Sequence, residues 1–166
     1  GGAVVKMLGL IRGRAISGED MAALKQAVAS MPPHPEVAAA LQKLKEAGFR
    51  MVTLTNNPEK TVIEQLKQAE LSRFFERSFS IDDHVRRYKP APESYGAVAT
   101  ALGVQLSQCC MVACHAWDIL GAAAVGMETA LLLRPGNAVI SVGPQPTITG
   151  SDLGVVADAL IACHVH

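Results

Sequence analysis

Three polar stretches, each directly after a short apolar run, contain the side chains best suited to chemistry. They are "TNNP" at 55–58, the charged loop from Asp82 to Lys89, and "CHAWD" at 114–118. Lys89 supplies an ammonium, and Asp118 is the one carboxylate that follows its apolar run. A carboxylate near an ammonium remains ionised and can hold or activate a water. We therefore take Lys89 and Asp118 as a candidate catalytic pair.

The stretch at 55–58 has the features of an anion site. Asn57 is a suitable N-cap and Pro58 a suitable first helical residue. Thr55 and Asn56 would then lie at a helix N-terminus, where free N–H groups and the helix dipole favour a carboxylate or phosphate. A plain strand-to-helix turn explains Asn57 and Pro58 equally well, so the sequence leaves both interpretations open.

Lys89 and Asp118 each have a simpler explanation as well. Pro90 keeps Lys89 out of the helical region, so its ammonium can reach over the strand ends, but it could equally be a solvated charge beside Arg86 and Arg87. An acid in the first turn of a helix is explained by the helix dipole alone. We predict that the side chains of Lys89, Asp118 and Thr55 lie close together. Such a cluster would favour a functional site over these simpler explanations.

The surrounding elements favour that convergence. Short apolar strands are expected at 49–55, 77–81, 109–114 and 129–133, and helices at 17–31, 35–47, after 58, 92–102, 117–125 and 153–163. Alternation of helices and apolar strands from Pro35 onward predicts a parallel sheet covered on both faces. In such sheets ligands bind beyond the carboxyl ends of the strands. All three polar stretches should therefore meet at one edge.

The helical spacing also predicts which side chains are buried. We expect Val62, Ile63, Leu66 and Ala69 to point inward from the helix after 58. Small residues after Asp118, among them Gly121, should let that helix approach the sheet closely. The segment after "RPGN" is expected to be irregular until the last helix.

Composition limits the classes of partner. The chain has 166 residues, 49% of them hydrophobic and 18% charged, as expected of a well-packed α/β domain. Fifteen basic and fifteen acidic residues cancel, so no global field recruits nucleic acid or an anionic membrane. No apolar run approaches the roughly 18–20 residues of a membrane span. Small molecules are the expected ligands.

The cysteines and the N-terminus bear on the compartment. Three of the four cysteines, Cys109, Cys110 and Cys114, fall on or beside one apolar strand, where they cannot easily bridge each other. The opening "GGAVVKMLGL" lacks the basic region and cleavage signature of a signal peptide. We predict reduced thiols and a cytoplasmic protein.

Taken together, "VTLTNN", "VRRYKPAPESY", "MVACHAWDILGA" and "LLLRPG" resemble, in order and spacing, the haloacid dehalogenase superfamily and its L-2-haloacid dehalogenase (type II) branch. The resemblance covers most of the chain from "PPHPEV" to the last helix. It implies an α/β fold with a Rossmann-like parallel sheet flanked by helices and the remnant of a helical cap. Residues 1–32 resemble the C-terminal part of the cap, and 33–166 the core without its first strand.

The resemblance also implies a reaction. An aspartate attacks C2 of a short (S)-2-haloacid, expels halide and forms an ester, which water hydrolyses to the (R)-2-hydroxyacid. By position, Lys89 resembles the lysine that balances the nucleophile's charge, and Asp118 the acid that orients Lys89 and the water. No cofactor is implied, and the expected partners are the 2-halo carboxylic acid and halide ion.

The remaining site residues are implied by position as well. Thr55 resembles the residue that binds the substrate carboxylate, and Asn56 resembles part of the halide cradle. The side chains in positions that bind or support substrate are Thr55, Asn56, Tyr95, His115 and Trp117.

Two departures keep alternatives open. Phosphatases of this superfamily carry an acid that helps to hold Mg²⁺ four residues before Asp118; Cys114 stands there, and a hard cation prefers oxygen ligands. We therefore expect no metal site. The nucleophile strand has no counterpart, so this chain alone should be inactive or very weak, and its unpaired strand edges should favour a homodimer. A phosphatase relative and a non-enzymatic dimerising module are the competing readings.

Overall fold

The computed structural model describes residues 7, 9–11, 13, 16–81 and 86–164. Five short strands form two separate groups. β1 (Val52–Thr55) pairs with β2 (Arg77–Ser80), while β3 (Cys110–Ala113) pairs with β4 (Glu128–Leu132), which also pairs with β5 (Ile148–Gly150). All three pairings are parallel. The predicted α/β class with parallel strands is confirmed, but the strands divide between two sheets.

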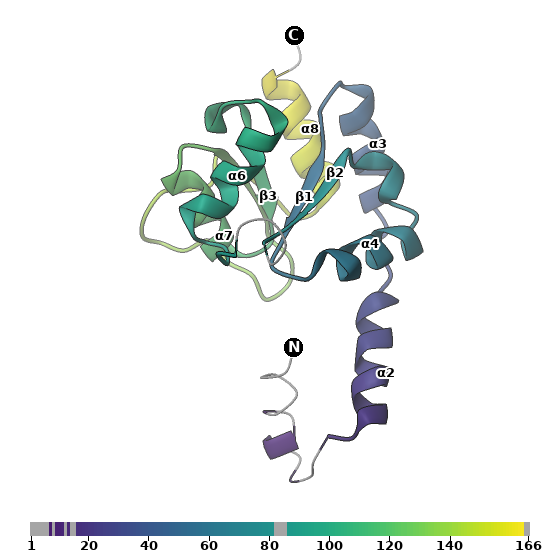
Figure 1. Ribbon diagram of the computed structural model, residues 1–166. Helices are drawn as coiled ribbons and strands as arrows, with labels where there is room; N and C mark the ends of the chain where they lie inside the picture. The colour runs from purple at the N-terminus through teal and green to yellow at the C-terminus, as the bar shows by residue number, and fades with distance from the viewer. Residues whose placement is uncertain (1–6, 8, 12, 14–15, 82–85, 165–166) are drawn as a thin grey trace.

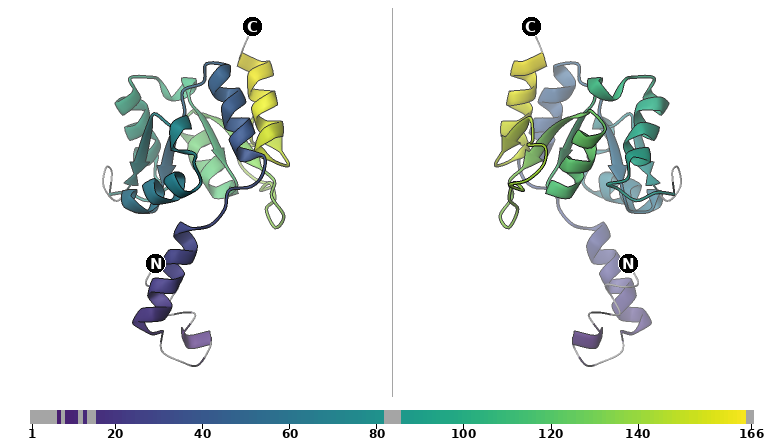
Figure 2. Two further views of the ribbon diagram at one scale, coloured as in Figure 1. Left: turned by 90° about the vertical axis from the view of Figure 1, so that its right-hand side faces the viewer. Right: turned by 90° about the vertical axis from the view of Figure 1, so that its left-hand side faces the viewer.

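Helices cover both faces of the strands (Figures 1 and 2). α3 and α8 pack against each other on one face, and α7 packs on β3 and β4 from the other face, with α6 beside it. The helices are α2 (Gly18–Ala29), α3 (Val37–Glu46), α4 (Glu59–Gln68), α6 (Pro92–Leu102), α7 (Ala116–Ala124) and α8 (Leu153–His164), with short 3₁₀ turns η1 (Ser72–Phe74) and η2 (Leu106–Gln108).

The main core lies under α3 and α8. Leu41 and Leu44 of α3 and Val156 and Leu160 of α8 pack on Leu132 of β4. The same cluster is bordered by Met51, just before β1, and by Val112 and Cys114 in and after β3. The two sheets therefore share one hydrophobic core. Burial of this apolar face is the principal stabilising term, at roughly 25 cal/mol per Å².

α2 projects away from the α/β body (Figures 1 and 2). Ser17 caps it in a reciprocal capping box with Asp20. Gln65 Nε2 of α4 donates to the Val28 carbonyl at 2.9 Å and fastens the end of α2 to the body. Leu24 is 37% exposed, because α2 has little to pack against within the described chain.

Some sequence expectations were wrong in detail. β5 falls inside the segment expected to be irregular; with only three residues, it depends on its pairing with β4. Ile63 is half-exposed while its neighbour Val62 is buried, because α4 turns a narrower face to the body than the pattern suggested. None of the helices in the described residues is long and apolar enough to span a membrane.

Candidate functional site

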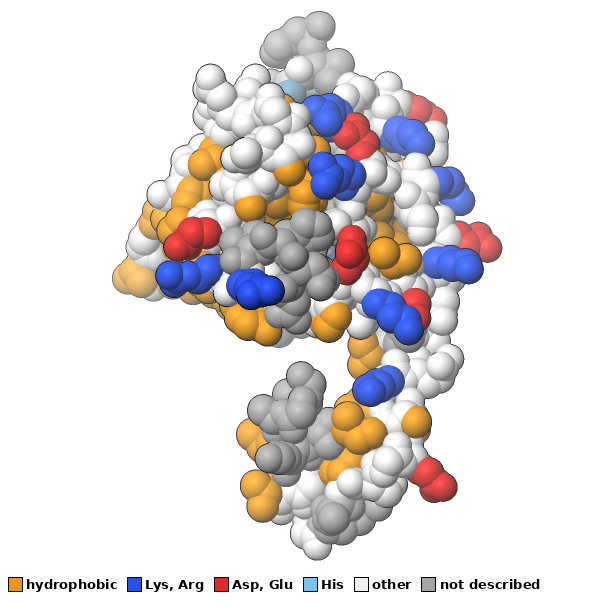
Figure 3. Space-filling view, in the orientation of Figure 1, with side chains coloured by type: hydrophobic (Ala, Val, Ile, Leu, Met, Phe, Trp, Pro, Cys, Tyr) orange, Lys and Arg blue, Asp and Glu red, His pale blue; other side chains and the backbone are white. Residues whose placement is uncertain are grey.

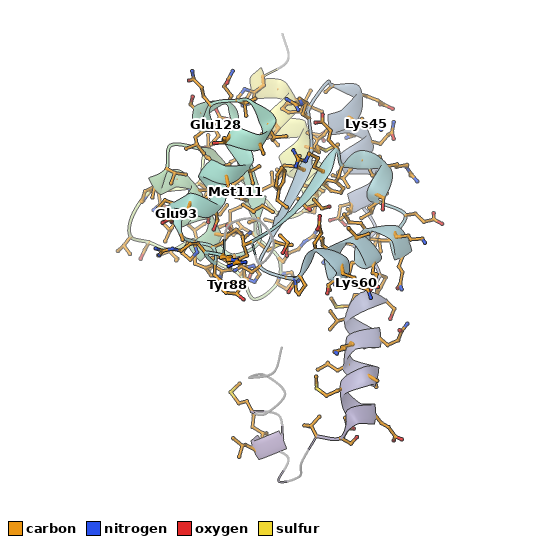
Figure 4. The ribbon with its side chains drawn as sticks, in the orientation of Figure 1. Lys45, Lys60, Tyr88, Glu93, Met111 and Glu128 are labelled. Atoms are coloured by element: carbon orange, nitrogen blue, oxygen red, sulfur yellow. The ribbon has the colours of Figure 1, made fainter. Side chains whose placement is uncertain are left out.

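The three polar stretches lie where β1, β2 and β3 end. In Figure 4, Glu128 at the start of β4 lies near the top of the body, and Tyr88, next to Lys89, lies at the bottom. The carboxyl ends of the strands therefore point toward the side from which α2 projects. Figure 3 shows a deep indentation of the surface between this end of the body and the region of α2.

At the centre of this region Lys89 and Asp118 form a buried ion pair. Lys89 Nζ lies 2.5 Å from Asp118 Oδ2, and the two side chains are 9% and 5% exposed. Two charges withdrawn from water in this way are stable only if they remain paired and hydrogen-bonded. The predicted convergence of Lys89 with Asp118 is present in the structure, and the alternative of a solvated lysine is wrong.

Tyr95 completes the cluster from α6. Its hydroxyl donates to Asp118 Oδ1 at 2.8 Å and lies 3.1 Å from the Asp118 carbonyl oxygen. Burial and the Asp118 carboxylate raise the pKa of Tyr95 far above its usual value of 10, so the phenol keeps its proton. Asp118 therefore receives one donor on each carboxylate oxygen, which fixes the orientation of its side chain.

Asn56 holds the backbone of Lys89 in place. Asn56 Oδ1 accepts from the Lys89 N–H at 3.0 Å, and Asn56 Nδ2 donates to the Lys89 carbonyl at 3.4 Å. A side chain at the end of β1 thus pairs with both polar groups of one residue in a distant loop. This pairing, together with Pro90, keeps the segment extended so that the ammonium reaches Asp118.

Ser94 anchors the same loop from the other end. Its hydroxyl is fully buried and donates to the Arg87 carbonyl at 2.6 Å. The sequence analysis did not single out Ser94, because a serine near a helix start is usually a local cap. The neighbouring Tyr95 was the available signal for Ser94, because these two adjacent residues of α6 both point into the site.

Gly121 allows the helix carrying Asp118 to come close to Lys89. A Cβ at this position would lie 2.5 Å from Pro90 Cβ and 2.6 Å from the Tyr95 hydroxyl oxygen. We expected Gly121 to serve contact with the sheet. In the structure the close contact is instead with Pro90 and Tyr95, which belong to the site.

Thr55 and Asn57 form the turn after β1. Thr55 Oγ1 accepts from the Asn57 N–H at 3.0 Å, and the Asn57 carbonyl accepts from the buried Ser80 hydroxyl at 2.9 Å. The predicted cap at Asn57 was wrong by one residue, because α4 starts at Glu59 after Pro58. The Asn57 N–H is therefore occupied, while the hydroxyl hydrogen of Thr55 has no acceptor among the described residues.

His115 and Trp117 form the outer wall of the site. The two rings stack at 5.5 Å between centroids with an interplanar angle of 30°. Trp117 is 40% exposed, and Lys89 Nζ lies 6.0 Å from the centroid of its ring, the outer limit of a cation–π contact. This arrangement leaves an aromatic surface open to a ligand beside the buried ion pair.

Cys114 does not face the ion pair but the core under α3 and α8, close to Arg134. Arg134, after β4, forms an ion pair with Glu36 at the start of α3, and its hydrogen bond holds the pKa of Glu36 below the usual value of 4.5. Arg134 belongs to "LLLRPG" but was not among the predicted site residues. Within the described residues no three His, Cys, Asp or Glu side chains are grouped as metal ligands would be.

All four cysteines are free, as predicted. Burial, with nearby Glu128 and Cys109, raises the pKa of Cys110 to about 12, and burial also raises the pKa of Cys109. These two thiols therefore stay protonated and serve as small apolar side chains.

Comparison with known proteins shows the family to which the chain belongs. The model of the haloacid dehalogenase-like hydrolase family matches residues 9–126, well over half of the chain. The chain belongs to this family. The matched range contains every residue of the candidate site.

Among relatives of the family, the chain is 34% identical over 114 residues to (S)-2-haloacid dehalogenase 4A of Burkholderia cepacia, covering 69% of this chain and 49% of that protein. It is 31% identical over 119 residues to haloacetate dehalogenase H-2 of a Moraxella species, covering 72% and 53%. The chain thus spans about half the length of these two curated relatives. A crystal structure of an L-2-haloacid dehalogenase superposes with a TM-score of 0.87 at 26% identity, covering 93% of this chain and 68% of that one.

Proposed function

We propose that this chain belongs to a hydrolase that converts short (S)-2-haloacids to (R)-2-hydroxyacids. The observation that carries the proposal is the buried Lys89–Asp118–Tyr95 cluster at the carboxyl ends of the strands. A buried ion pair costs desolvation free energy, so its presence beside an open aromatic wall favours a catalytic use. The relatives, which are named as (S)-2-haloacid and haloacetate dehalogenases, support a short 2-halo carboxylic acid as the class of substrate.

The reaction requires a nucleophilic aspartate in addition to Asp118. An aspartate oxygen forms a bond to C2 of the haloacid while the carbon–halogen bond breaks and halide leaves with its electron pair. Water then adds to the carbonyl of the aspartyl ester and releases the hydroxyacid, regenerating the carboxylate. Displacement from the rear inverts C2, which gives the (R) product.

Lys89 and Asp118 support both steps. The ammonium has three hydrogens and uses one on Asp118, so others remain for the attacking carboxylate and its ester. Asp118, held by Lys89 and by Tyr95, orients the ammonium and the hydrolytic water. Asp118 is almost completely buried and held by Lys89 and by Tyr95, so we assign it the orienting role and not the attack on carbon.

The nucleophile is therefore a further carboxylate. Among the described residues no second acid pairs with Lys89, and Asp82 and Asp83 lie outside the described residues. We propose that the nucleophilic aspartate lies on a strand that this chain does not include, so that the chain alone releases no halide.

Substrate-binding roles are assigned to side chains whose hydrogen-bond donors are not used within the described chain. Thr55 offers its hydroxyl hydrogen to the substrate carboxylate, next to the N-terminal end of α4. Asn56 Nδ2 has a second hydrogen that can contact the departing halide, because only one is used on the Lys89 carbonyl. The stacked rings of His115 and Trp117 cover the apolar side of the haloacid.

We propose that residues 1–32 are the C-terminal part of a helical cap over the core formed by 33–166, as the projecting α2 suggests. Four free cysteines favour action in the cytoplasm. The exposed Leu24 and Met31 of the α2 region favour a homodimer.

The decisive experiment uses the longest reading frame that encodes this chain. Halide release from (S)-2-chloropropionate, measured with a halide electrode in the presence of a chelator, should be fast for the complete protein and absent for the present chain. Lys89→Met in the complete protein should reduce the rate by about a thousandfold or more, because the charge that balances the ester-forming carboxylate is lost.

Lys43→Met is the matched control, since Lys43 also pairs with an acid but is exposed and far from the site. It should leave the rate unchanged. A folded complete protein that hydrolyses a phosphate ester with Mg²⁺ and releases no halide would refute the proposal in favour of the phosphatase alternative.

A further inference from the structure

Ser94, the third residue of α6, uses its hydroxyl outside its own helix. The side chain is fully buried, and Oγ donates to the Arg87 carbonyl at 2.6 Å, seven residues back along the chain. A serine near a helix start ordinarily bonds to backbone groups within about four residues. The hydrogen bond of Ser94 instead joins α6 to the loop that carries Lys89.

Two backbone hydrogen bonds close the segment between Arg87 and Ser94. The Ala91 N–H donates to the Tyr88 carbonyl at 3.0 Å, and the Ser94 N–H donates to the Ala91 carbonyl at 3.0 Å. Because these turns leave the segment little freedom, the position of the Arg87 carbonyl also determines where Lys89 lies. Ser94 therefore holds the backbone of Lys89 against α6.

Asn56 alone would not fix the direction in which the Lys89 side chain points. Asn56, at the end of β1, pairs with the N–H and the carbonyl of Lys89. Both contacts are to one residue, so the segment could still tilt about that point. The contact of Ser94 with the Arg87 carbonyl supplies a second point of attachment, from a different element, and removes that freedom.

Adjacent residues of α6 hold the two partners of the buried ion pair. The Tyr95 hydroxyl donates to Asp118 Oδ1 at 2.8 Å, while Ser94 holds the loop of Lys89. The 2.5 Å contact between Lys89 Nζ and Asp118 Oδ2 therefore depends on one turn of one helix. A change at Ser94 should move Lys89 and leave Asp118 in place.

The surroundings allow the loop little displacement toward α7. A Cβ added at Gly121 of α7 would lie 2.5 Å from Pro90 Cβ and 2.6 Å from the Tyr95 hydroxyl oxygen. Pro90, directly after Lys89, thus already packs closely against α7. Release of the loop from Ser94 is therefore expected to draw the Lys89 ammonium away from Asp118, since the loop cannot move closer.

We propose that Ser94 is a positioning residue for the reaction. Its hydroxyl does not touch the reacting atoms; it fixes the loop of residues 87–90 so that the Lys89 ammonium lies against Asp118 and toward the attacking carboxylate. The effect on turnover rests on the proposed function. The effect on the place of Lys89 does not, because it depends only on hydrogen bonds within the described chain.

The neighbouring Glu93 provides a matched control. Glu93 Oε1 lies 3.8 Å from Arg87 Nε, so this pair joins the same two segments as Ser94 does, but the side chains of Arg87 and Glu93 are 67% and 52% exposed. Exposed ion pairs of this kind contribute little. Glu93→Gln therefore removes a link between the same segments without releasing the loop.

The first measurement uses the chain itself and an amine reagent, with mass spectrometry to follow the acylation of each lysine. Lys89 is buried and paired, so it should react slowly. Ser94→Ala should raise its rate about three- to tenfold, the range that corresponds to the loss of one hydrogen bond, and Glu93→Gln should leave it unchanged. The rate at which a thiol reagent modifies Cys110, at the opposite end of β3, should stay the same.

A second variant covers the case in which Ser94→Ala does not fold. Ser94→Cys retains a side chain of similar size whose S–H donates only weakly. It should increase the reactivity of Lys89 as the alanine variant does, and it then takes the place of that variant in both measurements.

The second measurement uses the complete protein and (S)-2-chloropropionate. Ser94→Ala should lower kcat about tenfold or more, because a small misplacement of a charge beside the reacting atoms is costly. KM should stay within about twofold of the wild type, because Thr55 and not Lys89 is proposed to bind the substrate carboxylate. Glu93→Gln should change neither constant.

Several results would overturn the inference. They are unchanged Lys89 reactivity in Ser94→Ala, an equal rise in Glu93→Gln, an equal rise at Cys110, raised reactivity with unchanged kcat, and an effect on KM alone. If the reactivity of Lys89 rises as expected but the complete wild-type protein releases no halide, the proposed function fails, and the placement of Lys89 by Ser94 stands.

Discussion

The ion pairs Lys89–Asp118 and Lys43–Asp158 have the same chemistry but different surroundings. Lys89 and Asp118 are almost completely buried and share Tyr95, while Lys43 and Asp158 join α3 to α8 at 2.7 Å with side chains 53% and 62% exposed. Exposed pairs contribute about 0–1 kcal/mol, whereas breaking a buried pair leaves an uncompensated charge. Spacing along the chain would not distinguish the two pairs, but their burial does.

The largest expected effect is that of Asp118→Asn. It leaves the Lys89 ammonium buried without a counter-charge, so the free energy of unfolding should fall by about 3–5 kcal/mol. Urea denaturation followed by circular dichroism measures it. Asp158→Asn, the same change in the exposed pair, should cost less than about 1 kcal/mol. Equal losses for both variants would show that the burial difference has no energetic consequence.

Tyr95→Phe sharpens the comparison by removing one hydrogen bond and no charge. Loss of a donor to a buried carboxylate should cost about 1.5–3 kcal/mol, less than Asp118→Asn because the ion pair remains. Differential scanning calorimetry of Tyr95→Phe, Asp118→Asn and the double variant gives the coupling free energy between the two residues. Additive losses would contradict a connected Lys89–Asp118–Tyr95 cluster.

Gly121→Ala tests the close approach that permits the cluster. The added Cβ meets Pro90 and Tyr95 at distances that real contacts do not adopt, so we expect a loss of about 1–3 kcal/mol. Gly96→Ala in α6 is the matched control, because nothing lies within 4 Å of its Cβ position and helical alanine is favoured by about 0.5–1 kcal/mol. A thermal shift assay that ranks the two variants in the opposite order would overturn this packing.

Glu36→Gln has the smallest expected effect and a distinct pH dependence. The hydrogen bond from Arg134 lowers the pKa of Glu36 from 4.5 in the folded state. A carboxyl group with a lowered folded pKa contributes stability above its unfolded pKa and loses it as pH falls through the folded value. The wild type should therefore be the more stable at pH 7, and the difference should shrink as the pH falls below 4.5 and disappear below the lowered pKa of folded Glu36. A constant difference in melting temperature across that range would contradict this account.

Much of the fold could be read from local patterns. The capping box of Ser17 with Asp20 and the apolar stripe of Leu41 and Leu44 are short-range features, so helices α2 and α3 followed directly from them. β5 and the exposure of Ile63 could not be predicted, because a three-residue strand and one turn of a helix take their environment from distant neighbours. The turn at Asn57 could not be predicted either, because its carbonyl accepts a hydrogen bond from Ser80 of another strand.

The sequence by itself determined the candidate residues and their order along a parallel α/β chain, because strand ends and polar residue types are local properties. Only the tertiary structure decided that Lys89 is buried against Asp118, that Asn56 and Ser94 hold its loop, and that Gly121 admits the contact. Burial and charge pairing depend on segments about thirty residues apart meeting in space. No local pattern contains that information.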